Sequence, residues 1–226
     1  MLRMILKDLK IHARPVAYYF LVAAAFPFVL LLANGWKANP TFFDASFFTV
    51  IISPIMIGQW LISSEKIKRT LFLLRMLPVS TRKIFGAKEA CAALIIVAIA
   101  TFSVLSTFLC IQISNGWEIV RLPSARAWVW LALGIAFFTQ VVLLTHLTFD
   151  QRLASQVPFG GLFLLLILFG VMSNYFPEKM RVVERAFNNW LVIFAAAVVA
   201  LGGMILIHEI GARVLSNKDW SRSFTE

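Results

Sequence analysis

Residues 65–89 read EKIKRTLFLLRMLPVSTRKIFGAKE and lie between two long apolar stretches. They hold seven of the chain's 21 lysine and arginine residues. A basic loop between two membrane spans marks the cytoplasmic side of the membrane. The apolar run within it, residues 71–77, is too short to cross a bilayer. The sequence therefore predicts a short helix here that lies at the membrane surface or in the groove of a partner.

The composition places the chain among membrane proteins. Of its 226 residues, 60% are hydrophobic and 14% are charged, whereas soluble domains average roughly 45–50% apolar and about 25% charged residues. The formal net charge is +10. Because the basic residues concentrate in loops on one side, we expect anionic membrane lipids as their partners, and no nucleic acid. The predicted fold is all-α, since helices satisfy their own backbone hydrogen bonds in lipid.

Six apolar stretches are each long enough for a membrane-spanning helix of about 20 residues. They cover residues 16–34, 45–63, 90–114, 125–149, 157–175 and 190–208. We therefore predict an interface helix at residues 1–15 and a transmembrane domain of six helices at residues 16–226. The domain includes a cytoplasmic loop at 65–89 and an outer segment at 176–189.

The distribution of positive charge predicts the orientation. The two termini and the loops on their side of the membrane hold fifteen lysines and arginines, and the loops on the opposite side hold six. This bias predicts that both termini are cytoplasmic and that the protein is a multi-pass protein of the inner (plasma) membrane.

The first fourteen residues form an amphipathic pattern. Leu2, Ile5 and Leu9 share one helical face, and Arg3, Lys7 and Lys10 lie off it. This pattern favours a helix that lies along the inner leaflet before the first span. The alternative is a basic tail that only sets the topology.

The loop itself contains helix start and stop signals. Thr70 can cap a helix that runs to Leu77, where Pro78 ends it. Ser80 can cap a second helix that leads into the third span. The first helix would place Leu71, Leu74 and Leu77 on one apolar face.

This arrangement resembles the permease subunits of type-2 ABC exporters. In that family an acidic residue after the second span precedes a Thr-Leu, a Leu-Pro-x-Ser and a Gly-x-Lys. The corresponding residues here are Glu65, Thr70-Leu71, Leu77-Pro78-Val79-Ser80 and Gly86-Ala87-Lys88. The amphipathic amino-terminal helix, the six spans and the cytoplasmic termini extend the resemblance over the chain in outline.

The resemblance implies a permease of an ATP-driven exporter. The loop would be a coupling helix that inserts into a separate ABC ATPase, present in two copies, which binds ATP and Mg. A second permease, identical or paralogous, would complete the transporter. The residues implied in ATPase coupling are Glu65, Thr70, Leu71, Leu74, Leu77, Pro78 and Ser80.

The chain itself is predicted to be neither an enzyme nor the holder of a cofactor, because it contains no G-x-x-x-x-G-K-[ST] phosphate loop. His208-Glu209 begins like a zinc-protease motif, but position 212 is alanine, so the second histidine is missing. The alternative function is a non-transporting membrane scaffold or sensor partner that binds a cytosolic protein through the same loop.

Few polar residues interrupt the predicted spans. Gln59, Gln112, Gln140 and His146 are candidates for a translocation pathway, although hydrogen bonding between helices is an alternative role for them. The predicted spans are rich in Phe, Leu and Ile, so the walls of the pathway would be apolar. Such walls favour an amphipathic peptide, a lipid or a hydrophobic drug as substrate.

The outer segment 176–189 mixes charged residues with Met180, Val183 and Phe187. It is predicted to form a short amphipathic helix at the outer leaflet. In the resembled family this region can form a re-entrant hairpin that closes the exit, which would make these three residues an outer gate. The alternative is an ordinary connector at the interface.

Overall fold

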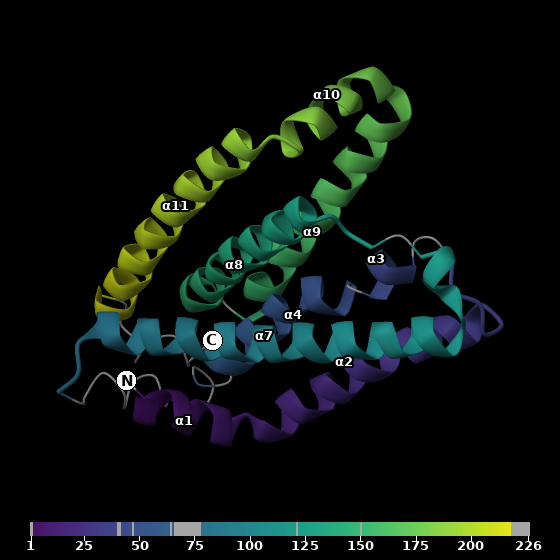
Figure 1. Ribbon diagram of the computed structural model, residues 1–226. Helices are drawn as coiled ribbons and strands as arrows, with labels where there is room; N and C mark the ends of the chain where they lie inside the picture. The colour runs from purple at the N-terminus through teal and green to yellow at the C-terminus, as the bar shows by residue number, and fades with distance from the viewer. Residues whose placement is uncertain are drawn as a thin grey trace. The chain divides into compact units, whose positions relative to one another are not determined.

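A computed structural model describes residues 2–39, 42–46, 48–63, 65, 78–120, 122–149 and 151–217. These residues contain helices and connecting turns and no strand, which confirms the predicted all-α class (Figure 1). The helices are α1 Leu2–Ile11, α2 Ala13–Ala33, α3 Phe42–Ser46, α4 Phe48–Gly58, the π-helix η1 Gln59–Ser63, α7 Thr81–Ile113, the 3₁₀-helix η2 Gly116–Glu118, α8 Ala125–Thr148, α9 Gln151–Tyr175, α10 Pro177–Phe187 and α11 Trp190–Asn217.

Four helices of the described part of the chain are long and apolar enough to cross a membrane: α2, α7, α8 and α11. They correspond to the predicted first, third, fourth and sixth spans. The apolar segments Phe48–Ser63 and Gln156–Leu165, within the predicted second and fifth spans, are shorter. The protein is thus a membrane protein with an all-helical fold, and the count of six spans stays a prediction.

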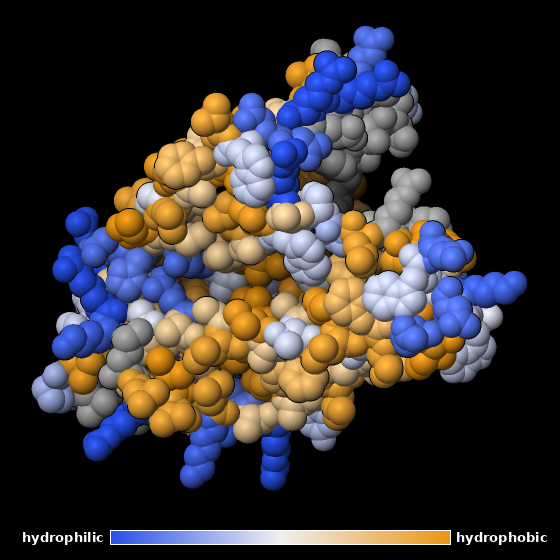
Figure 2. Space-filling model, in the orientation of Figure 1, coloured by the Kyte–Doolittle hydropathy of each residue, from blue (hydrophilic) through white to orange (hydrophobic). Residues whose placement is uncertain are grey.

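The surface agrees with a lipid environment. Figure 2 shows apolar side chains over much of the visible face, with hydrophilic side chains gathered over α10 and at the margins. On α11, Leu191, Phe194, Val199 and Ile205 are among the exposed large side chains. Such extensive apolar exposure marks a membrane or a protein interface.

The third predicted span begins earlier than the sequence analysis expected. α7 starts at Thr81 instead of residue 90 and runs without interruption for 33 residues. The helix predicted after Ser80 therefore continues directly into the span. The Ile84 backbone N–H donates to the Ser80 carbonyl at 3.1 Å, which closes the first turn.

The described chain divides into two compact units, and α7 contributes to both. The first unit comprises Met1–Leu61 and Gly86–Leu122. Phe42, Phe43 and Ile99 are fully buried in it. The Tyr19 hydroxyl donates to the Thr49 carbonyl at 2.6 Å and so joins α2 to α4.

The second unit comprises Ile62–Phe85 and Pro123–Glu226. In it α8 packs against α9 and α11, and α10 joins α9 to α11 (Figure 1). Gly203 permits close packing of α11 on α8, because a Cβ atom there would lie 2.8 Å from the Phe137 ring. The side chains of Val142, Leu143 and His146 form the buried face of α8.

Candidate functional site

The structure describes three of the seven predicted ATPase-coupling residues. Glu65 is helical and buried, and Pro78 and Ser80 precede α7 with exposed side chains. The other four lie outside the described residues, and the predicted apolar face of the coupling helix therefore stays a prediction. They are Thr70, Leu71, Leu74 and Leu77.

Polar contacts hold the chain just before the coupling loop and in its last residues. Before it, in the second unit, the Ser63 hydroxyl and the His146 Nδ1 atom of α8 are hydrogen-bonded at 2.8 Å. Within the last residues of the loop 65–89, also in the second unit, Arg82 of α7 forms an ion pair of 2.8 Å with Glu209 of α11. Both ends of the loop are thus tied to long helices.

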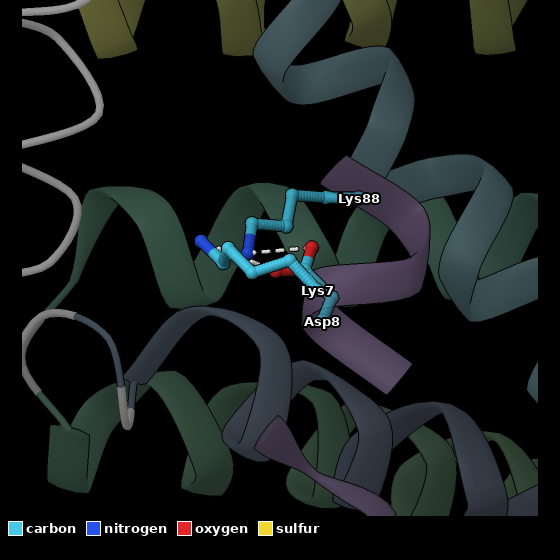
Figure 3. A network of polar contacts seen from close by, with 3 residues as sticks. All are labelled: Lys7, Asp8 and Lys88. Atoms are coloured by element: carbon cyan, nitrogen blue, oxygen red, sulfur yellow. Dashed lines mark ion pairs between the residues drawn. The ribbon is translucent and has the colours of Figure 1, made fainter. Parts of the chain in front are cut away.

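A third polar contact, within the first unit, joins Lys88 of α7 to Asp8 of α1. Figure 3 shows the Lys88 ammonium group and the Lys7 side chain both directed toward the Asp8 carboxylate. The Lys88 Nζ to Asp8 Oδ2 distance is 2.8 Å, and the Lys7 Nζ to Asp8 Oδ1 distance is 3.5 Å. Asp8 and Lys88 side chains are each only 2% exposed. Buried charges need such pairing, because an unpaired charge removed from water is strongly disfavoured.

Sequence reasoning missed this ion pair. The sequence analysis counted Lys88 among the cations of the basic loop 65–89, whereas the structure buries it. Asp8 is the buried residue of α1, and His12 in the turn after it is also buried, while Leu2 and Leu6 are exposed. The one signal in the sequence was an acidic residue isolated in a basic, amphipathic segment, and this signal does not identify the partner.

The first turns of α7 also pack closely against α11 in the second unit. The Phe85 side chain is buried, and its ring lies where a side chain at Gly211 would project. A Cβ atom at Gly211 would approach two atoms of that ring to 2.6 Å. The His208 ring lies 5.8 Å from the Phe85 ring, between centroids. His208 and Glu209 thus help to hold α11 against α7, and the described residues contain no cluster that could bind a metal ion.

The polar pathway candidates belong to different units. Gln59 and Gln112 lie in the first unit, where the Gln112 Oε1 atom accepts a hydrogen bond from the indole nitrogen of Trp117 at 2.7 Å. Gln140 and His146 lie on α8 in the second unit. His146 is fully buried, and its contact with Ser63 is a hydrogen bond between helices. Among the described residues, the half-buried Gln140 leaves its Oε1 atom without a hydrogen-bond partner.

The outer segment contains the helix α10, and its end is fixed to the start of α8. The Trp130 indole nitrogen donates to the Phe187 carbonyl at 2.9 Å, and the two ring centroids lie 4.6 Å apart. Val183 is half-buried, and the side chain of Met180 lies outside the described part of the structure. A pocket of about 430 Å³ opens beside this contact. Its lining is Ser124, Arg126, Ala127, Trp130, Leu131, Phe187 and Asn188.

Comparison with known proteins gives one finding. A family model described as ABC-2 family transporter protein matches residues 8–158, about two-thirds of the chain. The matched stretch includes Asp8, the whole loop 65–89, Lys88 and α8. Neither the comparison with curated proteins nor that with solved structures gives a significant match.

Proposed function

Because the chain belongs to the ABC-2 family of transporter proteins, we propose that it is the permease subunit of an ATP-driven exporter. Its partner is a separate ABC ATPase in two copies, which binds ATP and Mg, and a second permease completes the pathway. The loop 65–89 is the docking element for the ATPase. The chain supplies no phosphate loop of its own.

The observation that carries this proposal is the fixation of both ends of the loop. Ser63 is hydrogen-bonded to His146 before the loop, and Arg82 and Lys88 form ion pairs in its last residues. A loop whose ends are bonded to neighbouring helices transmits a displacement of the docked partner to those helices. A basic loop without such contacts would not transmit it. ATP-driven movement of a docked partner would therefore be transmitted to the spanning helices. The transmission would pass through packed elements that can switch between two arrangements.

The proposed substrate is amphipathic: a peptide, a lipid or a hydrophobic drug. Support comes from the predominance of apolar side chains on the long helices and the small number of polar ones. Gln140 and His146 are the pathway candidates on α8. The exit is proposed to be controlled by α10 through Phe187.

The decisive experiment is co-expression of the chain with the candidate ATPase, purification of the complex and measurement of its intact mass. The expected result is a complex of two permeases and two ATPase subunits that performs ATP-dependent export in reconstituted vesicles. A chain that binds a cytosolic protein but supports no ATP-driven transport would instead be a scaffold or sensor partner.

The proposed orientation in the plasma membrane predicts a labelling pattern. Lys83 and Glu118 are exposed at the two ends of the α7 region, and the native cysteines Cys91 and Cys110 are buried. A cysteine at position 83 is expected to react with an impermeant thiol reagent only from the cytoplasmic side. A cysteine at position 118 is expected to react only from outside. The reverse pattern would contradict the proposed topology and the cytoplasmic docking loop.

The proposed outer gate predicts a difference between Phe187→Ala and Arg181→Ala. Phe187 is about half exposed, so its truncation is expected to cost less than the roughly 3–5 kcal/mol of a fully buried phenylalanine. Loss of the contact with Trp130 should still loosen α10 and raise ATP hydrolysis without matching export. Arg181 is exposed, and its truncation should leave transport nearly unchanged.

Transport and ATP hydrolysis measured together in reconstituted vesicles check this prediction. Loss of export in the arginine variant with normal export in the phenylalanine variant would identify the segment as a charged recognition site for substrate or an extracellular partner.

A further inference from the structure

The ion pair between α1 and α7 is a buried link between the amino terminus and the segment that leaves the coupling loop. Asp8 and Lys88 are each 2% exposed, while the Lys7 side chain beside them is 36% exposed. Figure 3 draws Lys7, Asp8 and Lys88 with the ion pairs between them. Opening the Asp8–Lys88 pair would separate two opposite charges that are both kept from water, which is unfavourable.

The position of Lys88 in α7 links this pair to the loop. α7 is continuous from Thr81, and Lys88 lies about 10 Å along it at a rise of 1.5 Å per residue. A displacement of the start of α7 therefore reaches Lys88 through an unbroken helix. On α1, the exposed side chains of Leu2, Leu6, Arg3 and Lys10 point away from the buried Asp8.

We infer that Asp8 and Lys88 are positioning residues that make α1 and the start of α7 move together during the transport cycle. The inference rests on the proposed function, since it concerns how movement of the docking loop spreads through the permease. A pair kept away from water is too costly to open in every turnover, so a moving α7 carries α1 with it. The α1 helix, with exposed leucines beside basic side chains, then moves against the inner leaflet.

The first test compares neutral variants of the pair with a matched control. In Asp8→Asn the buried Lys88 loses its ion pair with Asp8, and in Lys88→Met the buried Asp8 loses its ion pair with Lys88. Each is expected to lower the amount of substrate exported per ATP hydrolysed by at least about tenfold. Arg213→Met is the control, because Arg213 is an exposed cation on α11, outside the loop 65–89. It is expected to leave the ratio unchanged.

Exchange of the two charges distinguishes pairing from simple folding defects. The double variant Asp8→Lys with Lys88→Asp is expected to recover most of the export ratio lost in the single variants. Unchanged ratios in both single variants, or a double variant no better than either, would overturn the inference.

The second test joins the two helices covalently. In a Cys91→Ala, Cys110→Ala background, Asp8→Cys and Lys88→Cys are bridged by a short bifunctional reagent that forms disulfides with both thiols. The reduced sample lacks the ion pair, so bridging is expected to raise its export per ATP hydrolysed, because the covalent link restores the shared movement of the two helices. Export that is lost on bridging and restored by reductant would show that the helices must part. If the bridge does not form, the contact between position 8 of α1 and position 88 of α7 would be contradicted.

Wild-type measurements separate the two proposals. A wild-type complex that does not couple ATP hydrolysis to export overturns the proposed function. A wild-type complex that does so, together with normal variants at positions 8 and 88, overturns the linkage of α1 to α7 alone.

Discussion

Gly211→Val is expected to disrupt the packing of α11 on α7. The Cβ atom alone would lie 2.6 Å from the Phe85 ring, and Phe85 is buried with little room to move. Overpacking of this kind typically lowers the free energy of unfolding by about 1–3 kcal/mol. We expect a lower melting temperature of the detergent-solubilised protein and loss of coupled transport.

Gly202→Val is the matched control on the same helix. No atom lies within 4 Å of a Cβ atom built at Gly202, so valine there should leave stability and transport close to wild type. A compensating variant, Gly211→Val with Phe85→Ala, should recover part of the lost stability because the ring is removed. Equal melting temperatures for the two single glycine variants would contradict the close packing of Phe85 on Gly211.

Leu74→Asp is expected to abolish association with the ATPase. Leu74 lies outside the described residues, and the prediction rests on the apolar face that it is proposed to share with Leu71 and Leu77. A carboxylate buried in the cleft of a partner without a counter-charge would cost several kcal/mol. The permease should still insert into the membrane, because the loop is not a span.

Co-purification of the ATPase and export in vesicles measure this effect. Arg213→Asp serves as the control, since it introduces the same carboxylate at an exposed position on α11, outside the loop 65–89. It should retain ATPase binding. Normal co-purification and normal export in Leu74→Asp would remove the basis for regarding the loop as a coupling helix.

The membrane class and the long helices could be predicted from composition and run length. α2, α8 and α11 begin within about three residues of the predicted stretches. These features depend on local hydropathy, which a single sequence displays directly. The short helix α10 could be predicted for the same reason, because its apolar and charged residues alternate with helical spacing.

The start of the third span was placed at residue 90 because hydropathy marks only the part of a helix that suits lipid. A helix was predicted to start after Ser80, but Arg82, Lys83 and Lys88 assigned residues 81–89 to the loop, although none of these three residues interrupts a helix. The pairing of Asp8 with Lys88 could not be predicted at all. The two residues are 80 positions apart, and neither periodicity nor charge counting identifies which lysine among 21 faces the carboxylate.

The length of α7 has a mechanical consequence. Thirty-three residues at 1.5 Å per residue extend for about 50 Å, and the hydrocarbon core of a bilayer is only about 30 Å thick. Oriented along the membrane normal, the helix would project beyond the hydrocarbon core, and its projecting end would act as a lever arm. A tilt of about 10° around the far end would shift the near end by roughly 9 Å. A small tilt of α7 within the membrane would thus shift its end at the membrane surface by nearly the diameter of a helix.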